Sequence, residues 1–234
     1  MSNIGQWEVK EVCVSSPTVR KGSTHNANNV EPLLTCGLRT RCAMIVGTHM
    51  ALEIEKKYIL DKKLIVEMTA RLAELGAEFA YETFEENYLH RGGILDERNA
   101  VLRLRKTNER TLLTYKEKLT TDGDIKHQIE FETVVANVDA MESIIEKLGY
   151  HLSVVYEKHR KSWHFGKVEV VLDELPFGYY MEIEGEVKNI LKAEKLLGAT
   201  SLQSEARGYP RLTLKFGEDK NGVFEARFKK KSAT

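Results

Sequence analysis

The segment Leu52-Glu-Ile-Glu-Lys-Lys-Tyr-Ile59 begins by alternating apolar and charged side chains, and this alternation is the period of a β-strand. Side chains two residues apart on a strand point to the same face of a sheet. Glu53, Glu55 and Lys57 therefore share one face, and the opposite face begins with Leu52 and Ile54. The pattern predicts a strand with one apolar face and one strongly charged face.

The same pattern recurs along the chain, between turn-like segments that contain Gly, Asn and Asp. Further predicted strands cover residues 100–106, 111–118, 127–133, 154–165, 168–172 and 180–184. Each places two charged side chains on one face, and most strands carry a single sign of charge. These pairs are Arg103 with Arg105, Lys116 with Lys118, Glu130 with Glu132, Lys158 with Arg160, Glu169 with Asp173, and Glu182 with Glu184.

Three segments with apolar residues at helical spacing lie between these strands. Each ends in a Leu-Gly pair, and the glycines of these pairs are Gly76, Gly149 and Gly198. Helices with an apolar stripe need a surface to pack against, and the outward faces of a closed barrel provide one. We therefore expect an α+β fold, an antiparallel closed eight-stranded β-barrel with covering helices. Its charged faces would then line the interior.

Such an interior would hold about eight carboxylates and seven cations, and burying charge is costly unless the charges are paired or bound to ions. Paired carboxylates without His or Cys are hard oxygen ligands, which suit Mg²⁺ or Mn²⁺. Arg and Lys opposite them would bind phosphoryl oxygens. The pattern favours a metal-bound polyphosphate as ligand. A salt-bridged sheet without a small ligand is the alternative.

Composition excludes several other classes of protein. The 234 residues contain 35 Lys and Arg and 35 Asp and Glu, so net charge does not favour nucleic-acid binding. A hydrophobic content of 42% excludes a disordered polyelectrolyte. Cys13, Cys36 and Cys42 lack the spacing of a zinc site or a disulfide framework, and no apolar run approaches the roughly 18 residues of a membrane span. We expect a cytoplasmic protein that does not associate with membranes.

The segments that carry these patterns resemble one family. Glu53-Ile-Glu-Lys-Lys57 resembles the Glu-x-Glu-x-Lys signature of the CYTH superfamily, the triphosphate tunnel metalloenzymes. Later segments resemble this family in order: Leu102-Arg-Leu-Arg105, Thr114-Tyr-Lys-Glu-Lys118, Gln128-Ile-Glu-Phe-Glu132, Glu157-Lys-His-Arg160, Val170-Val-Leu-Asp173 and Met181-Glu-Ile-Glu-Gly185. We therefore place a tunnel domain at residues 50–217, after a poorly ordered N-terminal extension at 1–49 and before a basic C-terminal tail at 218–234.

The resemblance implies a tunnel that holds a triphosphate and Mg²⁺ or Mn²⁺. It assigns metal binding to Glu53, Glu55, Glu182, Glu184 and Asp173, with Glu130 and Glu132 as further acidic tunnel residues. It assigns phosphate binding to Lys57, Arg103, Arg105, Lys116, Lys118, Lys158 and Arg160, and catalysis to Glu55 and Lys57. Residues 86–90 depart from the family pattern and are interpreted as a loop. Arg207 and Arg211, in the closing segment, are either further phosphate contacts or part of a solvated loop.

The family contains class IV adenylate cyclases, thiamine triphosphatases, and inorganic or RNA triphosphatases. We expect hydrolysis of a phosphoanhydride bond in inorganic triphosphate, thiamine triphosphate or a nucleoside triphosphate, because a metal-bound triphosphate and water are sufficient for it. Conversion of ATP to cyclic AMP and pyrophosphate also requires a seated purine. It remains the first alternative, and a non-catalytic polyphosphate sensor is the second. The expected partner is the small-molecule triphosphate, and a homodimer is an open option.

Overall fold

The computed structural model describes residues 51–229, and all of them belong to one structural unit. The strands are β1 (Ala51–Leu60), β2 (Glu78–Arg91), β3 (Ala100–Lys106), β4 (Thr111–Asp122), β5 (Ile125–Val135), β6 (His151–Phe165), β7 (Val168–Leu175), β8 (Gly178–Glu184), β9 (Glu218–Lys220) and β10 (Val223–Ala226). The helices are α1 (Lys62–Glu74), α2 (Ile94–Glu97), α3 (Val138–Lys147), α4 (Val187–Leu197) and α5 (Tyr209–Phe216), with a short 3₁₀ turn at Ala199–Ser201. The predicted extension at 1–49, with its three cysteines, lies outside the described residues.

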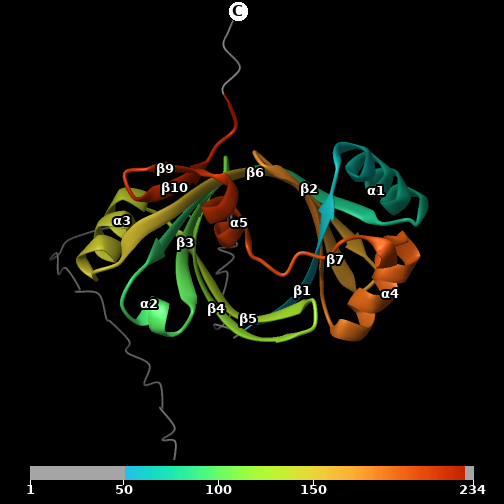
Figure 1. Ribbon diagram of the computed structural model, residues 1–234, viewed down its shortest axis with the longest axis horizontal. Helices are drawn as coiled ribbons and strands as arrows, with labels where there is room; N and C mark the ends of the chain where they lie inside the picture. Colours follow the sequence, from blue (N-terminus) through green and yellow to red (C-terminus); the bar gives the residue numbers. More distant parts are fainter. Residues whose placement is uncertain (1–50, 230–234) are drawn as a thin grey trace, which may run out of the picture. The chain divides into compact units, whose positions relative to one another are not determined.

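Eight of the strands form a closed ring, which Figure 1 shows from one end. Their order is β2-β3-β4-β5-β1-β8-β7-β6, and β6 pairs with β2 to close the ring. Every neighbouring pair in the ring is antiparallel. The predicted fold class, an antiparallel α+β fold with a closed ring of strands, is therefore confirmed.

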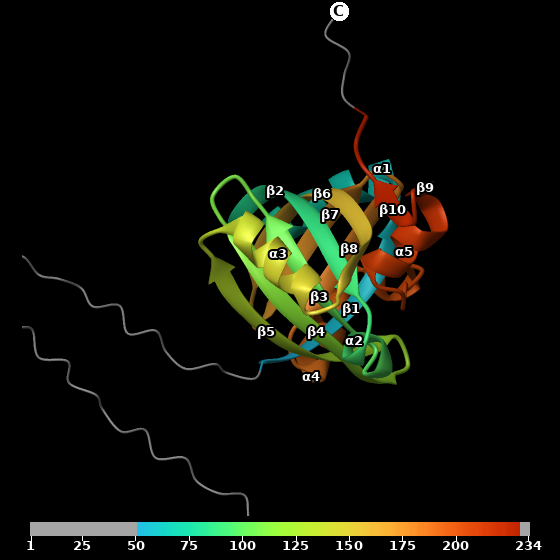
Figure 2. The same cartoon turned by 90° about the vertical axis from the view of Figure 1, so that its left-hand side faces the viewer.

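Helices pack against the apolar outer face of the ring. α1 and α4 cover β1, β7 and β8 through a core that includes Leu72, Met181, Ile183 and Ile190, all fully buried. On another part of the ring, Ile145 of α3 packs with Leu104 of β3 and Val135 of β5. Figure 2 shows α3 lying over the outside of these strands. Because the outward side chains are buried in this way, the charged side chains of the same strands face inward.

The predicted Leu-Gly helix ends are confirmed, because α1 and α3 end directly before their Leu-Gly pairs and α4 ends at Leu197. The Asp61 carboxylate caps α1 by accepting a hydrogen bond from the Leu64 amide at 2.7 Å. Gly198, directly after α4, has a φ of 72°, a conformation that residues with a Cβ rarely adopt. Among residues 51–229, no helix is long and apolar enough to cross a membrane.

The interpretation of residues 86–90 as a loop is wrong, because they lie in β2 and pair with both β3 and β6. Alternation fails to reveal this strand because both of its faces carry polar side chains. Glu85 and Asn87 are buried inside the ring, while Glu86 and His90 lie on the other face. Period-two patterns identify a strand only where its two faces differ in polarity.

The segment after Gly217 is not simply a tail. β10 pairs in parallel with Val154–Tyr156 of β6, and β9 pairs with β10. β7 pairs with β6 only from His159 onward, so the earlier part of this edge of β6 would otherwise lack backbone partners. β10 satisfies those groups and lengthens the wall of the ring.

Candidate functional site

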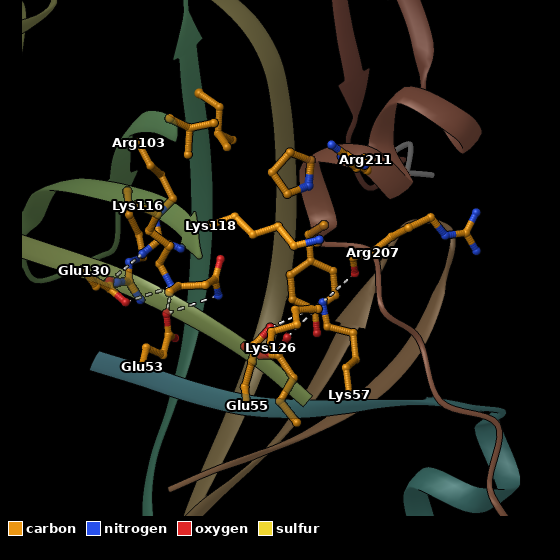
Figure 3. Close-up of a pocket in the computed structure, with 18 of the residues that line it drawn as sticks. Glu53, Glu55, Lys57, Arg103, Lys116, Lys118, Lys126, Glu130, Arg207 and Arg211 are labelled. Carbon is orange, nitrogen blue, oxygen red and sulfur yellow. Dashed lines mark hydrogen bonds and ion pairs between the residues drawn. The ribbon is translucent and has the colours of Figure 1, made fainter. Parts of the chain in front are cut away.

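The ring encloses a cavity of about 460 Å³, to which all eight of its strands contribute side chains. In Figure 3, side chains from β1, β3, β4 and β5 point into it. Twelve of the predicted site residues line this cavity: Glu53, Glu55, Lys57, Arg103, Arg105, Lys116, Lys118, Glu130, Lys158, Arg160, Glu182 and Glu184. The other two, Glu132 and Asp173, lie outside its lining. The inward charged faces of strands far apart in the sequence thus converge on one space.

The cavity lining is more basic than the sequence pattern indicates, with five Lys and six Arg against six Glu. Two predicted carboxylates are absent from the lining, and it gains cations that were not assigned to the site. These cations are Arg91 and Lys126, which were not predicted, and Arg207 and Arg211, for which the sequence left phosphate contact and a solvated loop open. A chain with zero formal net charge therefore concentrates positive charge in its cavity, which favours an anionic ligand.

Three carboxylates inside the cavity form the candidate metal site. Oxygen atoms of Glu53, Glu55 and Glu184 lie within 4.8 Å of one another. β1 supplies the first two and β8 the third, and Glu55 stands directly opposite Glu184 in the ladder. Burial and the charges of the neighbouring carboxylates together raise the pKa of the Glu184 carboxyl to about 8, against the opposing effect of the Arg160 charge. A bound cation would relieve this repulsion, and three hard oxygen donors fit Mg²⁺ or Mn²⁺.

Glu182 and Asp173 hold cations in the described structure. The Glu182 carboxylate lies 3.0 Å from Lys57 Nζ and 2.6 Å from an Arg160 nitrogen. Asp173 is fully buried, and it accepts hydrogen bonds from Arg160 Nε at 2.8 Å and from the Tyr209 hydroxyl at 2.8 Å. These contacts orient Lys57 and Arg160 toward the cavity. The metal role that the resemblance assigns to the two carboxylates stays a prediction.

Lys57 is the most enclosed cation of the site, with 1% of its surface exposed. Burial opposes its charge, but the carboxylates of Glu182, Glu55 and Asp173 outweigh burial and raise its pKa. Its ammonium donates a hydrogen bond to the Arg207 carbonyl oxygen at 3.2 Å. It also lies 3.7 Å from the centre of the Tyr209 ring, a cation–π contact. Lys57 is therefore a charged donor held in one position.

A second group of ion pairs lies on the opposite wall, on β3, β4 and β5. Lys116 Nζ contacts Glu53 at 2.7 Å and Glu130 at 2.9 Å. Arg105 contacts Glu132 at 2.5 Å, and Arg103 lies 3.6 Å from Glu130. The Nε atoms of both arginines are buried and have no hydrogen-bond partner among the described residues. Buried donors without acceptors suit a site built to bind an anion.

Two buried residues of this network are missing from the predicted site. Lys126 lies one residue before the predicted strand at 127–133, and its Nζ is 2.6 Å from Glu55. Its alternation with Gln128 and Glu130 was the signal that could have identified it. Glu85, on β2, lies 3.4 Å from Lys158 and 3.6 Å from Arg105. Nothing in the polarity of β2 marked Glu85 as an inward residue.

The closing segment forms one side of the cavity. The Glu205 amide donates a hydrogen bond to the Lys57 carbonyl at 2.9 Å, which attaches this segment to β1. The Glu205 carboxylate accepts two hydrogen bonds from the Arg207 guanidinium, at 2.8 and 2.5 Å. Arg211 lies on α5 rather than in a loop and is exposed to solvent. Both arginines line the cavity, and α5 carries Tyr209 into it.

Comparisons with known proteins agree with this fold. The PH1012 protein from Pyrococcus horikoshii OT3 is 23% identical, with 68% of this chain and 98% of that chain covered and a TM-score of 0.61. A candidate adenylate cyclase from Vibrio parahaemolyticus is 18% identical, with 70% and 98% covered and a TM-score of 0.57. HpAC1 from Hippeastrum, a candidate adenylyl cyclase described as having a dominant triphosphatase activity, is 17% identical, with 68% and 91% covered and a TM-score of 0.53.

At these identities the solved structures establish likeness of fold alone. A comparison with curated proteins finds no significant match. The family model for the CYTH domain matches residues 51–211, which span every strand of the ring and all the residues of the carboxylate site. The chain therefore belongs to the CYTH domain family.

Proposed function

We propose that this protein is a metal-dependent enzyme that hydrolyses a phosphoanhydride bond of a triphosphate bound inside the ring. The observation that carries the proposal is the juxtaposition of the Glu53, Glu55 and Glu184 carboxylates with a surplus of Lys and Arg in one enclosed cavity. A triphosphate with a divalent cation has the complementary arrangement of charge. A cavity of about 460 Å³ is also in the size range of small-molecule sites.

The cations of the cavity are placed to bind phosphate from two sides. Lys57 and Arg160 are held by carboxylates on the β8 side, and Arg103, Arg105 and Lys116 lie on the opposite wall. The free Nε donors of Arg103 and Arg105 would donate to phosphoryl oxygens without first breaking a hydrogen bond. A chain of phosphates between the walls would therefore be bound along its length.

Phosphoryl transfer requires in-line positioning and neutralisation of the charge that develops on the transferring group. When bound at Glu53, Glu55 and Glu184, Mg²⁺ or Mn²⁺ would supply Lewis-acid stabilisation of that charge. Lys57, fixed by Glu182 and by the Tyr209 ring, would donate a hydrogen bond to a phosphoryl or leaving oxygen. The wall of the ring limits the access of bulk water, so these electrostatic interactions act at reduced dielectric.

Adenylate cyclase activity is a second candidate, and one feature of the cavity favours it. Leu89, Val101, Tyr156 and Pro210 add an apolar surface to the cavity lining. Such a surface could accept the base of a nucleoside triphosphate. Hydrolysis still has fewer requirements, because the site does not need to bind the purine base in a defined position. HpAC1, one of the structural neighbours, is a candidate adenylyl cyclase with a dominant triphosphatase activity, and this supports the order of the two candidates.

The experiment that tests the proposal uses the purified full chain with tripolyphosphate, thiamine triphosphate and ATP, each with Mg²⁺ and with Mn²⁺. Orthophosphate, pyrophosphate and cyclic AMP are measured in every reaction. We expect orthophosphate from at least one substrate, and loss of turnover in Glu55→Gln but not in Glu67→Gln, a change on the exposed surface of α1. Formation of cyclic AMP and pyrophosphate from ATP would show that the protein is an adenylate cyclase and would overturn the proposed hydrolysis. Tight triphosphate binding with no product under any condition would instead identify a sensor.

A further inference from the structure

Lys126 occupies a position that the proposed metal-dependent function does not explain. It stands directly opposite Glu55 in the ladder between β5 and β1, so the two side chains share the inward face. Its Nζ lies 2.6 Å from Glu55 Oε1, and 3% of the residue is exposed. Lys126 lines the cavity, and Figure 3 shows it beside Glu55 and Lys57. A buried ammonium thus holds one of the three carboxylates of the candidate metal site.

An ammonium and a divalent cation compete for the same carboxylate, because each is stabilised by its negative charge. Glu55 stands between Lys126 on β5 and Glu184 on β8, each in direct register with it. Without a cation nearby, the three clustered carboxylates would repel one another at short range. The Lys126 ammonium, 2.6 Å from Glu55, reduces this repulsion.

The other cations near this site also pair with carboxylates outside it. Lys116 contacts Glu53 but also Glu130 at 2.9 Å. Arg160 is 4.0 Å from Glu184 but only 2.6 Å from Asp173. Among residues 52–119 and 123–229, whose side chains the structure describes, Glu55 is by contrast the only carboxylate that pairs with Lys126. Lys126 is therefore the cation that can leave the site at the smallest cost in other contacts.

We propose that Lys126 is a displaceable counterion, which holds Glu55 when the metal is absent and moves to the bound phosphates when the metal enters. This inference rests on the proposed function, since it requires a metal at Glu53, Glu55 and Glu184. The lysine side chain suits the role because its charge is carried on a flexible four-carbon stem. Lys126 is a positioning residue under this proposal, and it acts on the site through Glu55.

The test is the affinity of the full chain for Mg²⁺ and Mn²⁺, measured by titration calorimetry without triphosphate. Lys126→Met removes the competitor of the metal, so we expect metal binding about tenfold tighter than in the wild-type protein. This factor corresponds to the lower end of the energy of one hydrogen bond to a charged group. Lys118→Met is the matched control, because Lys118 lines the same cavity and forms no ion pair within the described part of the chain. Its metal affinity should change by less than about threefold, because the half-buried Lys118 charge holds none of the three carboxylates.

A second readout separates displacement from a general change of charge. Without metal, Lys126→Met should melt at a lower temperature than the wild-type protein, because Glu55 loses its counterion. With saturating Mg²⁺ the difference should become smaller, because the tighter-binding variant gains more stability from the same metal concentration. Lys126→Met that binds metal with unchanged or weaker affinity would overturn the proposal, since Lys126 would then be a fixed phosphate ligand or a support for Glu55. Failure of the wild-type protein itself to bind either metal would instead overturn the proposed function.

Discussion

Asp173→Asn distinguishes a carboxylate that binds metal from one that positions cations. Asp173 is fully buried, and it accepts hydrogen bonds from two nitrogen atoms of Arg160 and from the Tyr209 hydroxyl. Lys158 Nζ lies 3.4 Å away. The substitution keeps the shape of the side chain but removes one of the two buried counterions of each cation, so that Arg160 keeps only Glu182 and Lys158 keeps only Glu85 at these distances.

The expected loss in the free energy of unfolding follows from these contacts. A hydrogen bond to a charged group contributes about 1.5–3 kcal/mol, and an asparagine retains one acceptor oxygen of the two. Loss of about half of the contacts predicts a decrease of roughly 3 kcal/mol in the free energy of unfolding, in line with the cost of removing one partner of a buried ion pair. A domain of this size tolerates such a loss, because its total stability is about 5–15 kcal/mol.

The assay combines urea unfolding of the metal-free protein with calorimetric titration of Mn²⁺. We expect Asp173→Asn to lower stability while changing the affinity for Mn²⁺ by less than about threefold. Glu184→Gln should do the reverse, with affinity reduced at least about tenfold and stability maintained, because one of three clustered like charges is removed. The reasoning is refuted if Asp173→Asn leaves stability within about 1 kcal/mol of wild type and weakens Mn²⁺ binding as strongly as Glu184→Gln.

Further predictions concern Glu85 of β2, the aromatic side chain of Tyr209 and the C-terminal strands β9 and β10. Burial opposes the charge of Glu85, but Lys158, Arg160 and Arg105 outweigh it and hold the pKa of this carboxyl well below its usual range. Its contribution to stability is therefore present above the unfolded-state pKa of about 4.3 and lost as the pH falls. Glu85→Gln should cost about 3 kcal/mol at pH 7, and the difference in urea stability from wild type should shrink below about pH 4; a constant difference would contradict this assignment. Tyr209→Phe removes a hydrogen bond to Asp173 but keeps the ring near Lys57, so thermal denaturation should show a loss of about 1 kcal/mol, and substrate KM should stay nearly unchanged. Truncation after Gly217 removes the partner of Val154–Tyr156, so hydrogen exchange at these amides should accelerate, whereas unchanged exchange would show that β10 does not protect this edge.

Much of the fold follows from local patterns that any reader of the sequence can check. β3 occupies the predicted range of 100–106, and α1, α3 and α4 end at the predicted Leu-Gly positions. These elements were predictable because one face of each is apolar and the other is charged. β2 was missed because its faces do not differ in this way, and β10 was missed because its pairing depends on the length of β6 relative to β7.

For the site, alternation along the strands determined by itself that Glu53, Glu55 and Lys57 share a face, and that Arg103 with Arg105 and Glu182 with Glu184 do the same. The sequence could not determine which of these charges would pair, because ion pairs join residues from strands whose order in the ring is set by long-range packing. Only the tertiary structure placed Glu184 beside Glu53 and Glu55, assigned Glu182 and Asp173 to Arg160, and brought Lys126 and Glu85 into the network. The physical reason is that side-chain direction is a local property of the backbone, whereas Coulomb energy depends on distances that exist only after the ring has closed.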